Sequence, residues 1–377
     1  MENGIREQEK QLKERLKERL SLVRGLDEEV MGQTEKRWDS IAKPLKSLGL
    51  LEKNVTKIAG ISGSVKPQIG KRALIAMCAD NGVVEEGVTQ TGAEVTAIVA
   101  QNMAHGSTTV TVMAEAAGVD VFPVDIGMVT EGICLSGVPE EKEEIKPRTL
   151  LLRKVGRGTK NFAKEPAMGK EEALRAILVG MELAGRLKSQ GYEILATGEM
   201  GIGNTTTSSA VASVLLDEPV EKMTGKGAGL SDAGLQRKIS VIQHALEQLK
   251  PDRECPLDVL SKVGGYDIAG LTGVFLGGAV YRIPVLVDGF ISSVAALLAV
   301  RLLPEAKDFM VASHISKEPA GGLVLSALDL SPMLCCEMCL GEGTGAVAGL
   351  SALDMGFTVY HSMATFDDIQ VEQYQPL

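Results

Sequence analysis

Three glycine-rich segments hold the side chains of this sequence that are best suited to chemistry. The first, residues 196–207, reads ATGEMGIGNTTT. Its glycines let backbone N–H groups approach an anion, and a helix starting at the threonines adds the partial positive charge of its N-terminus. The segment is neither a Walker A loop nor a G-x-G-x-x-G fingerprint. It predicts either an anion-binding turn or a structural strand-to-helix turn capped by Asn204 or Thr205, and the acidic Glu199 within it favours binding.

The second segment, TGKGAGLSD at residues 224–232, precedes a helix predicted for residues 232–250. Apolar side chains of that helix share one face, and Lys238 lies at the edge of this stripe. Its ammonium group either reaches out to water or points back toward the glycine loop and binds a phosphate. Two glycine loops and one lysine suffice for a single nucleotide phosphate.

The third segment, LGEGTGA at residues 340–346, leads into a helix predicted for residues 347–355. Glycines on both sides of Glu342 leave space for a flat ligand to reach its carboxylate. A carboxylate in the first turn of a helix is otherwise a partner of the helix dipole. The flanking glycines favour a ligand-binding Glu342.

Cysteines and histidines give little support for a metal site. Cys335, Cys336 and Cys339 contain one C-x-x-C, but no second pair follows and no histidine lies at ligand spacing. We expect these thiols in the core or on a helix face. The four histidines form no H-x-x-x-H or H-x-E pattern. We therefore expect neither a metal nor a cofactor.

Composition excludes several classes of protein. A formal net charge of −10 argues against nucleic-acid binding, which requires a basic surface. Residues 1–30 lack the apolar core of a signal peptide, and the most apolar stretch, residues 283–303, contains Asp288 and Arg301. We interpret that stretch as a buried strand followed by a helix, and we expect a cytoplasmic protein with reduced thiols and no membrane contact.

Short apolar runs alternate with helical patterns through most of the chain. Strands are predicted at residues 73–79, 119–124, 193–197, 283–287 and 309–312, and helices at 94–117, 170–190, 205–216, 232–250 and 289–302. Such alternation predicts an α/β fold with a parallel sheet covered on both faces. Ligands of such sheets bind outside the carboxyl ends of the strands, where the glycine-rich segments fall. Residues 139–166 are polar and predict a loop.

The first part of the sequence differs, because it predicts helices alone. Residues 5–23 carry one narrow apolar stripe in a charged background, a second helical stretch precedes Pro44, and residues 50–59 form a third. We expect the first helix to dock on the body of the protein, the alternative being an arm that serves a dimer.

Several motifs together resemble one enzyme family. They are DNGVVEEGV, GEMGIGNTT, LVDGF, ASH-x-S-x-EP and LGEGTGA, with WDSIAKPLKSLGLLE near the N-terminus, and they occur in order from about residue 34 to residue 355. This set resembles the nicotinate-nucleotide–dimethylbenzimidazole phosphoribosyltransferases. The resemblance implies a Rossmann-like three-layer domain with a parallel sheet, plus a small helical domain from chain-terminal segments, in a homodimer. We assign residues 1–70 to the N-terminal helical segment, 71–330 to the catalytic domain and 331–377 to a C-terminal helical segment.

The resemblance also implies a reaction and its residues. Ribose 5-phosphate passes from nicotinate mononucleotide to a benzimidazole-type base, with inversion at C1′, during assembly of a cobamide lower ligand. Glu342 is similar in position to the general base of the family. The implied substrate contacts come from Gly201, Gly227 and Lys238 at the phosphate, from Glu199, Asp288 and Ser316 in the nucleotide pocket, from Leu340 and Thr91 beside the base, and from Gly203 and Asn204 of the first motif.

The sequence departs from the family pattern at three places. Thr91-Gly92 replaces an aromatic–proline pair, Ile315 replaces an arginine, and Ala320-Gly321 replaces a Gly-His pair. The first change falls in the implied base pocket and leaves open which base is accepted. The second removes a positive charge near the nucleotide.

The same pocket is compatible with two other functions. A nucleotide hydrolase would use Glu342 to activate water, and a non-enzymatic azole carrier would need no base at all. For the transferase we expect desolvation to raise the pKa of Glu342, with a helix terminus opposing the shift.

Overall fold

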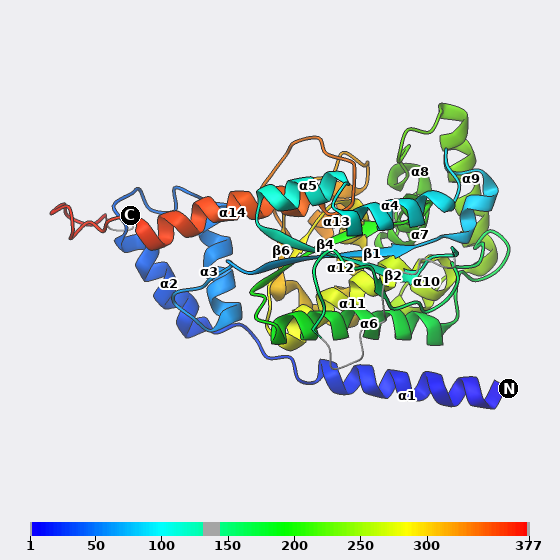
Figure 1. The fold of residues 1–377 in the computed structure, drawn as a ribbon, viewed down its shortest axis with the longest axis horizontal. Helices are drawn as coiled ribbons and strands as arrows, with labels where there is room; N and C mark the ends of the chain where they lie inside the picture. The colour runs from blue at the N-terminus through cyan, green and yellow to red at the C-terminus, as the bar shows by residue number, and fades with distance from the viewer. Residues whose placement is uncertain (1, 131–143, 375–377) are drawn as a thin grey trace.

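The computed structural model describes residues 2–130 and 144–374, and a six-stranded parallel sheet forms its centre (Figure 1). The strands are β1 (Arg72–Ala79), β2 (Val119–Gly127), β3 (Leu151–Leu152), β4 (Ile194–Met200), β5 (Val285–Val287) and β6 (Met310–Ala312). Their order is β3-β2-β1-β4-β5-β6, and every neighbouring pair is parallel. The chain therefore reverses its direction of winding between β1 and β4, which is where doubly wound sheets bind ligands.

The five predicted strands are confirmed, with two differences. β3 lies in the segment predicted as a loop, because two residues are too few to give a strand pattern. β4 extends to Met200, so Gly198 and Glu199 pair with Ala76 and Met77 of β1 instead of lying in the glycine loop.

Helices cover both faces of the sheet (Figure 1). Ile75 and Met77 of β1 pack toward α6 (Lys170–Ser189), α7 (Asn204–Leu216), α10 (Pro256–Val263), α11 (Tyr266–Tyr281) and α12 (Phe290–Leu302). Leu74 and Ala76 pack toward α3 (Leu50–Ser62), α4 (Glu94–His105), α5 (Thr109–Ala116) and α14 (Thr344–Ser362). Alternate side chains of a strand point to opposite faces, so each face has its own core.

One helix prediction was wrong, and one long helix was missed. The helix predicted for residues 94–117 is divided into α4 and α5, because Gly106 adopts a left-handed conformation and Thr108 caps α5. α11 was not predicted, since nearly all its side chains are buried and it has no polar face. It packs so closely on α6 that a Cβ atom at Gly273 would overlap the carbonyl of Ile177.

The N-terminal helix α1 (Glu2–Leu20) docks on the body, as expected. Leu16 is buried, and Arg19 Nη1 donates to the Tyr281 hydroxyl at 2.8 Å. Figure 1 shows α1 alongside α6, on the opposite side of the sheet from α5 and α14.

Segments from both ends of the chain meet at one end of the molecule (Figure 1). α2 (Glu28–Ser40) packs on α3, and α3 packs on α14. The Trp38 and Tyr360 rings lie 5.0 Å apart, and Phe366 N donates to Ser40 O at 3.0 Å. The remaining short elements are η1 (Gly82–Glu86), α8 (Val220–Met223), η2 (Pro304–Phe309) and α13 (Gly321–Ala327), and α9 (Asp232–Leu249) follows the second glycine loop. No helix in the described part of the chain is long and apolar enough to cross a membrane.

Candidate active site

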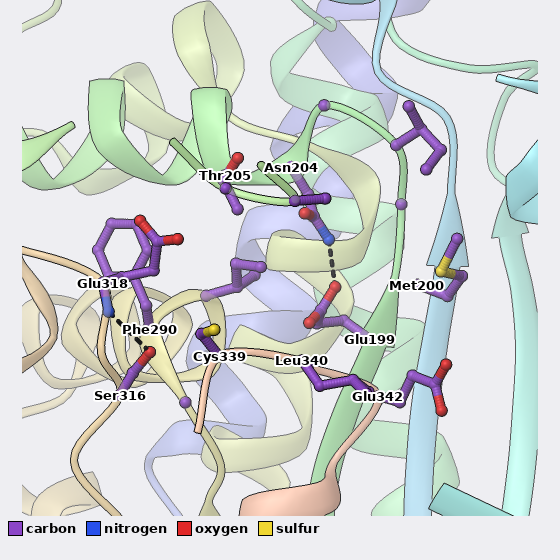
Figure 2. Close-up of a pocket in the computed structure, with 18 of the residues that line it drawn as sticks. Glu199, Met200, Asn204, Thr205, Phe290, Ser316, Glu318, Cys339, Leu340 and Glu342 are labelled. Carbon is purple, nitrogen blue, oxygen red and sulfur yellow. Dashed lines mark hydrogen bonds between the residues drawn. The ribbon is translucent and has the colours of Figure 1, made fainter. Parts of the chain in front are cut away.

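A pocket of about 270 Å³ opens beside the carboxyl ends of β4, β5 and β6. All of the predicted site residues except Lys238 line it, namely Thr91, Glu199, Gly201, Gly203, Asn204, Gly227, Asp288, Ser316, Leu340 and Glu342. The three glycine-rich segments thus converge on one cavity, although they are far apart in the sequence (Figure 2).

The loop that carries Glu342 has an unusual backbone. Glu342 has a φ of 62°, between Gly341 at 88° and Gly343 at 99°. For a non-glycine residue this left-handed conformation costs roughly 1–2 kcal/mol. Gly198 of β4 lies directly against the Glu342 carbonyl, where a side chain would clash. Glu342 lies just before α14, so the alternative in which it is a dipole partner in the first turn of a helix is excluded.

The Glu342 carboxylate is held by another helix, α5. Its Oε2 accepts a hydrogen bond from Val110 N, in the first turn of α5, at 3.1 Å. Desolvation raises the pKa of Glu342, and this N–H opposes the rise. The expected direction is confirmed, but the opposing helix terminus belongs to α5 and not to α14.

Asp288 stabilises the start of α14. Its Oδ1 accepts from Ala346 N at 2.8 Å, and the backbone N–H groups of Gly343 and Gly345 also favour its charged form. Burial outweighs these contacts and raises its pKa to about 7. Asp288 lies at the pocket, but much of its carboxylate binds the loop that carries Glu342.

Lys238 is fully buried, which excludes the alternative that it extends to water and favours the one that points it toward the glycine loop. Its Nζ donates to Thr205 Oγ1 at 2.8 Å and to Gly225 O at 3.2 Å. Desolvation lowers its pKa to about 8, while the nearby Glu318 opposes the shift. Lys238 therefore connects the first glycine segment to the second without itself lining the pocket.

Several pocket residues were not singled out from the sequence. Glu318 is mostly buried, and its Oε2 has no hydrogen-bond partner among the described residues. It belongs to the quoted ASH-x-S-x-EP motif, two positions after Ser316, which was the available signal. Thr205, named from the sequence only as a candidate helix cap, also lines the pocket, and the N-cap of α7 is Gly203 instead. Phe290 of LVDGF lines the same cavity (Figure 2).

The cysteine trio lies elsewhere than expected. Cys335, Cys336 and Cys339 are exposed free thiols in irregular chain between α13 and α14, neither in the core nor on a helix. Cys339 lines the pocket beside Leu340 (Figure 2). Among residues 2–130 and 144–374 no three His, Cys, Asp or Glu side chains are grouped so as to hold a metal ion.

Comparison with known proteins gives one consistent result. Residues 23–371 match a family model described as phosphoribosyltransferase. The chain is 46% identical over 360 residues to the nicotinate-nucleotide–dimethylbenzimidazole phosphoribosyltransferase of Ruminiclostridium cellulolyticum, covering 96% of this chain and 99% of that one. It is 48% identical over 357 residues to the protein of the same name from Acetivibrio thermocellus, covering 95% and 98%. A crystal structure of the enzyme of that name from Thermus thermophilus superposes with a TM-score of 0.83 at 38% identity, over 93% of this chain and all of that one.

Proposed function

The chain belongs to the nicotinate-nucleotide–dimethylbenzimidazole phosphoribosyltransferase family, and on that premise we propose that it transfers ribose 5-phosphate from nicotinate mononucleotide to 5,6-dimethylbenzimidazole or a related azole. The products are nicotinate and the α-ribazole 5′-phosphate from which a cobamide lower ligand is built. A ring nitrogen of the azole forms the new bond to C1′ as the bond from C1′ to the pyridinium nitrogen breaks.

This reaction needs one proton acceptor and no acid. The pyridinium takes the bonding electron pair and leaves as a neutral pyridine ring, while the azole loses its N–H proton. Glu342 is the acceptor: its desolvated carboxylate has a raised pKa and is therefore a stronger base, and Val110 N orients it.

The observation that carries the proposal is the arrangement of the two ends of the pocket. Figure 2 shows Glu342 and Leu340 on one side and Thr205 on the other, and Thr205 Oγ1 accepts a hydrogen bond from Lys238, which also binds Gly225 of the second glycine segment. A nucleotide whose phosphate contacts Gly201 and Gly227 directs C1′ toward Glu342. Orientation of this kind lowers barriers by roughly 7–11 kcal/mol in well-aligned reactions.

The remaining roles follow from position. Leu340, two residues before Glu342, contacts the azole, Thr91 at the pocket wall is the second residue assigned to the azole, and Ser316, Gly203 and Asn204 contact the nucleotide. Thr91 is exposed and small, so it sets no close limit on the shape of the azole, and a panel of bases identifies the preferred one.

Incubation with nicotinate mononucleotide and a panel of azoles tests the function. We expect mass spectrometry to detect a riboside phosphate of the added base, and proton NMR to show the α configuration. Release of free ribose 5-phosphate with or without an azole would replace the transferase with a hydrolase. Binding of the azole without any turnover would indicate a non-enzymatic azole carrier.

We also propose a homodimer, and the domain division at residues 70 and 330. The exposed apolar side chains of Ile98, Val112 and Met355, on α4, α5 and α14, support an interface on that side of the sheet. Sedimentation equilibrium of the protein and of a Val112→Asp variant tests it. A monomeric wild-type protein would refute the dimer.

A further inference from the structure

Three polar side chains form a connected group behind the pocket wall. Asn204 Nδ2 donates to Glu199 Oε2 (Figure 2), and the Asn204 side chain also acts as a hydrogen-bond donor to Asp267 at the start of α11. The other oxygen of Glu199 faces the loop of Glu342, where a Cβ atom at Gly341 would lie 2.5 Å from Oε1. One amide thus connects a pocket carboxyl group to a carboxyl group in the core.

The inner carboxyl group has an unsatisfied oxygen. Asp267 is fully buried, and its Oδ2 has no hydrogen-bond partner among the described residues. This oxygen faces Gly201, where a Cβ atom would lie 2.8 Å from it. A buried acceptor without a donor is costly, and burial penalises the charged form of this carboxyl group above all.

The surroundings of the pair are acidic. The charges that act most on Glu199 come from Asp267, Asp288 and Glu342, and Asp80 acts on Asp267. The Cys78 thiol at the end of β1 also lies in the field of both carboxyl groups. Desolvation and these charges raise the pKa of Glu199 to about 8, and desolvation above all raises that of Asp267 to about 7. Two such groups in one desolvated site do not ionise together.

We propose that Asp267 is a positioning residue whose charge is coupled to that of Glu199 across Asn204, so that the two carboxyl groups together hold one proton while the pocket is empty, and that the positive ring of the bound nucleotide displaces this proton to solvent. The proposal rests on the proposed function, which places C1′ and the pyridinium between Glu342 and the glycine segments. The cationic ligand then supplies the positive charge that the acidic wall lacks. The same wall discriminates against a nucleotide with a neutral ring.

Comparison of two ligands isolates the ring charge. Nicotinate mononucleotide carries a pyridinium, whereas the corresponding C-riboside 5′-phosphate of benzoate has the same shape and phosphate with a carbon in place of the ring nitrogen. Isothermal titration calorimetry in buffers of different ionisation enthalpy counts the protons released by each. Because both ligands carry the same phosphate, protonation at Lys238 and Glu318 cancels in the difference.

For the wild-type protein we expect the pyridinium ligand to release more protons than the neutral ligand. The ratio of their affinities should then rise with pH between about 6.5 and 8, by at most about tenfold per pH unit for one proton. Equal proton counts, or a ratio independent of pH, would overturn the proposal. Nicotinate release in the presence of azole is assayed separately, so failure of the transferase function is distinguished from failure of this inference.

Asp267→Asn removes one acid while keeping the shape of the side chain. The pKa of Glu199 then falls because one neighbouring charge is lost, although desolvation remains, so both the excess proton release and the pH dependence of the ratio should decrease. Glu199→Gln, which removes the other acid of the pair, should have the same effect on the proton release and on the pH dependence of the ratio. A wild-type proton count in folded Asp267→Asn protein, judged by thermal unfolding, would remove Asp267 from the pair.

Asp125→Asn is the matched control. Asp125 is a buried acid at the end of β2, but its Oδ2 lies 3.2 Å from Lys154 Nζ, so it already has a cation. We expect this variant to keep the proton release of the wild type. Loss of the release in both variants would show a general effect of buried acids and would refute the assignment to Asp267.

Discussion

Glu342 combines a strained backbone, a desolvated carboxylate and a single N–H donor from another helix. Such a group is costly to the fold, and strained residues of this kind cluster at functional sites. We expect Glu342→Gln to lower kcat by roughly 10²- to 10⁴-fold, since the azole keeps its proton. The nucleotide KM should change little, because the phosphate contacts lie at the other end of the pocket. Steady-state kinetics with saturating azole measures both.

Glu337→Gln provides the control for this substitution. Glu337 lies in the same loop with a similar left-handed backbone, but it is exposed and pairs with Lys317 at 3.1 Å. Its variant should keep the wild-type kcat. A wild-type kcat in Glu342→Gln would refute the role of Glu342 as a base.

Lys238 contributes a buried positive charge where two glycine segments meet. Lys238→Ala removes the bonds to Thr205 and Gly225 as well as the charge, so we expect the nucleotide KM to rise roughly 10- to 100-fold, as for loss of a charged hydrogen bond. The KM of the azole should stay near its wild-type value. Initial-rate measurements with each substrate varied in turn separate the two constants.

Lys222→Ala tests whether any nearby lysine gives the same result. Lys222 is half exposed and pairs with Glu218 on the surface, so its loss should leave both constants unchanged. If Lys238→Ala had an unchanged nucleotide KM, the lysine would serve only to join the two loops.

For single residues, the sequence identified which side chains belong to the site more reliably than whether each is buried or exposed. The glycines around Glu342 marked it because close packing against β1 and β4 requires glycine at these positions. The burial of Lys238 and the exposure of Cys339 left no such trace. They depend on how α9 and the chain between α13 and α14 are placed by distant parts of the fold.

Among the elements, the N-terminus of α14 links stability to catalysis. Asp288 binds its first N–H groups, so Asp288→Asn should weaken the start of the helix and let the Glu342 loop move. Because burial already disfavours the charge of Asp288, the helix-terminus contribution is largely offset, and we expect a loss of about 1 kcal/mol of stability or less, together with a lower kcat. Thermal unfolding and kinetics measure the two effects on the same preparation.

Asp354→Asn separates the two effects. Asp354 lies in the same helix and pairs with Arg72 at 2.6 Å, away from the pocket. Its variant should lose stability without losing kcat. If Asp288→Asn lost stability alone, Asp288 would have no part in holding Glu342.

Helices were predictable where one side faces solvent and the other side faces the core. α6 and α9 have a polar and an apolar side, so their sequence patterns matched the observed bounds closely. α11 is buried on all sides and rich in glycine, because it lies between α6 and the sheet. Its pattern reflects close packing and not amphipathicity, which is why periodicity did not reveal it.

On the scale of the whole molecule, α1 and the pocket lie on different sides of the structure. α1 contacts α6 and α11, whereas the pocket opens at the carboxyl ends of the strands. The apolar stripe of α1 has one buried leucine, Leu16, flanked by the partly buried Leu12 and Leu20. Burial of one leucine contributes about 1.5–3 kcal/mol at most, and ordering the helix offsets part of it.

Removal of residues 1–22 should therefore lower the midpoint of thermal unfolding by a few degrees and leave kcat and both KM values unchanged. Leu16→Asp should reproduce this effect by placing a charge in the apolar contact, whereas Glu14→Lys, on the exposed side of the helix, should not.

Sedimentation equilibrium of the truncated protein decides between docking and an intersubunit arm. If truncation dissociated a dimer, the contacts of α1 with its own subunit would be secondary to contacts with a second subunit. An unchanged oligomeric state with reduced thermal stability would assign α1 to its own fold.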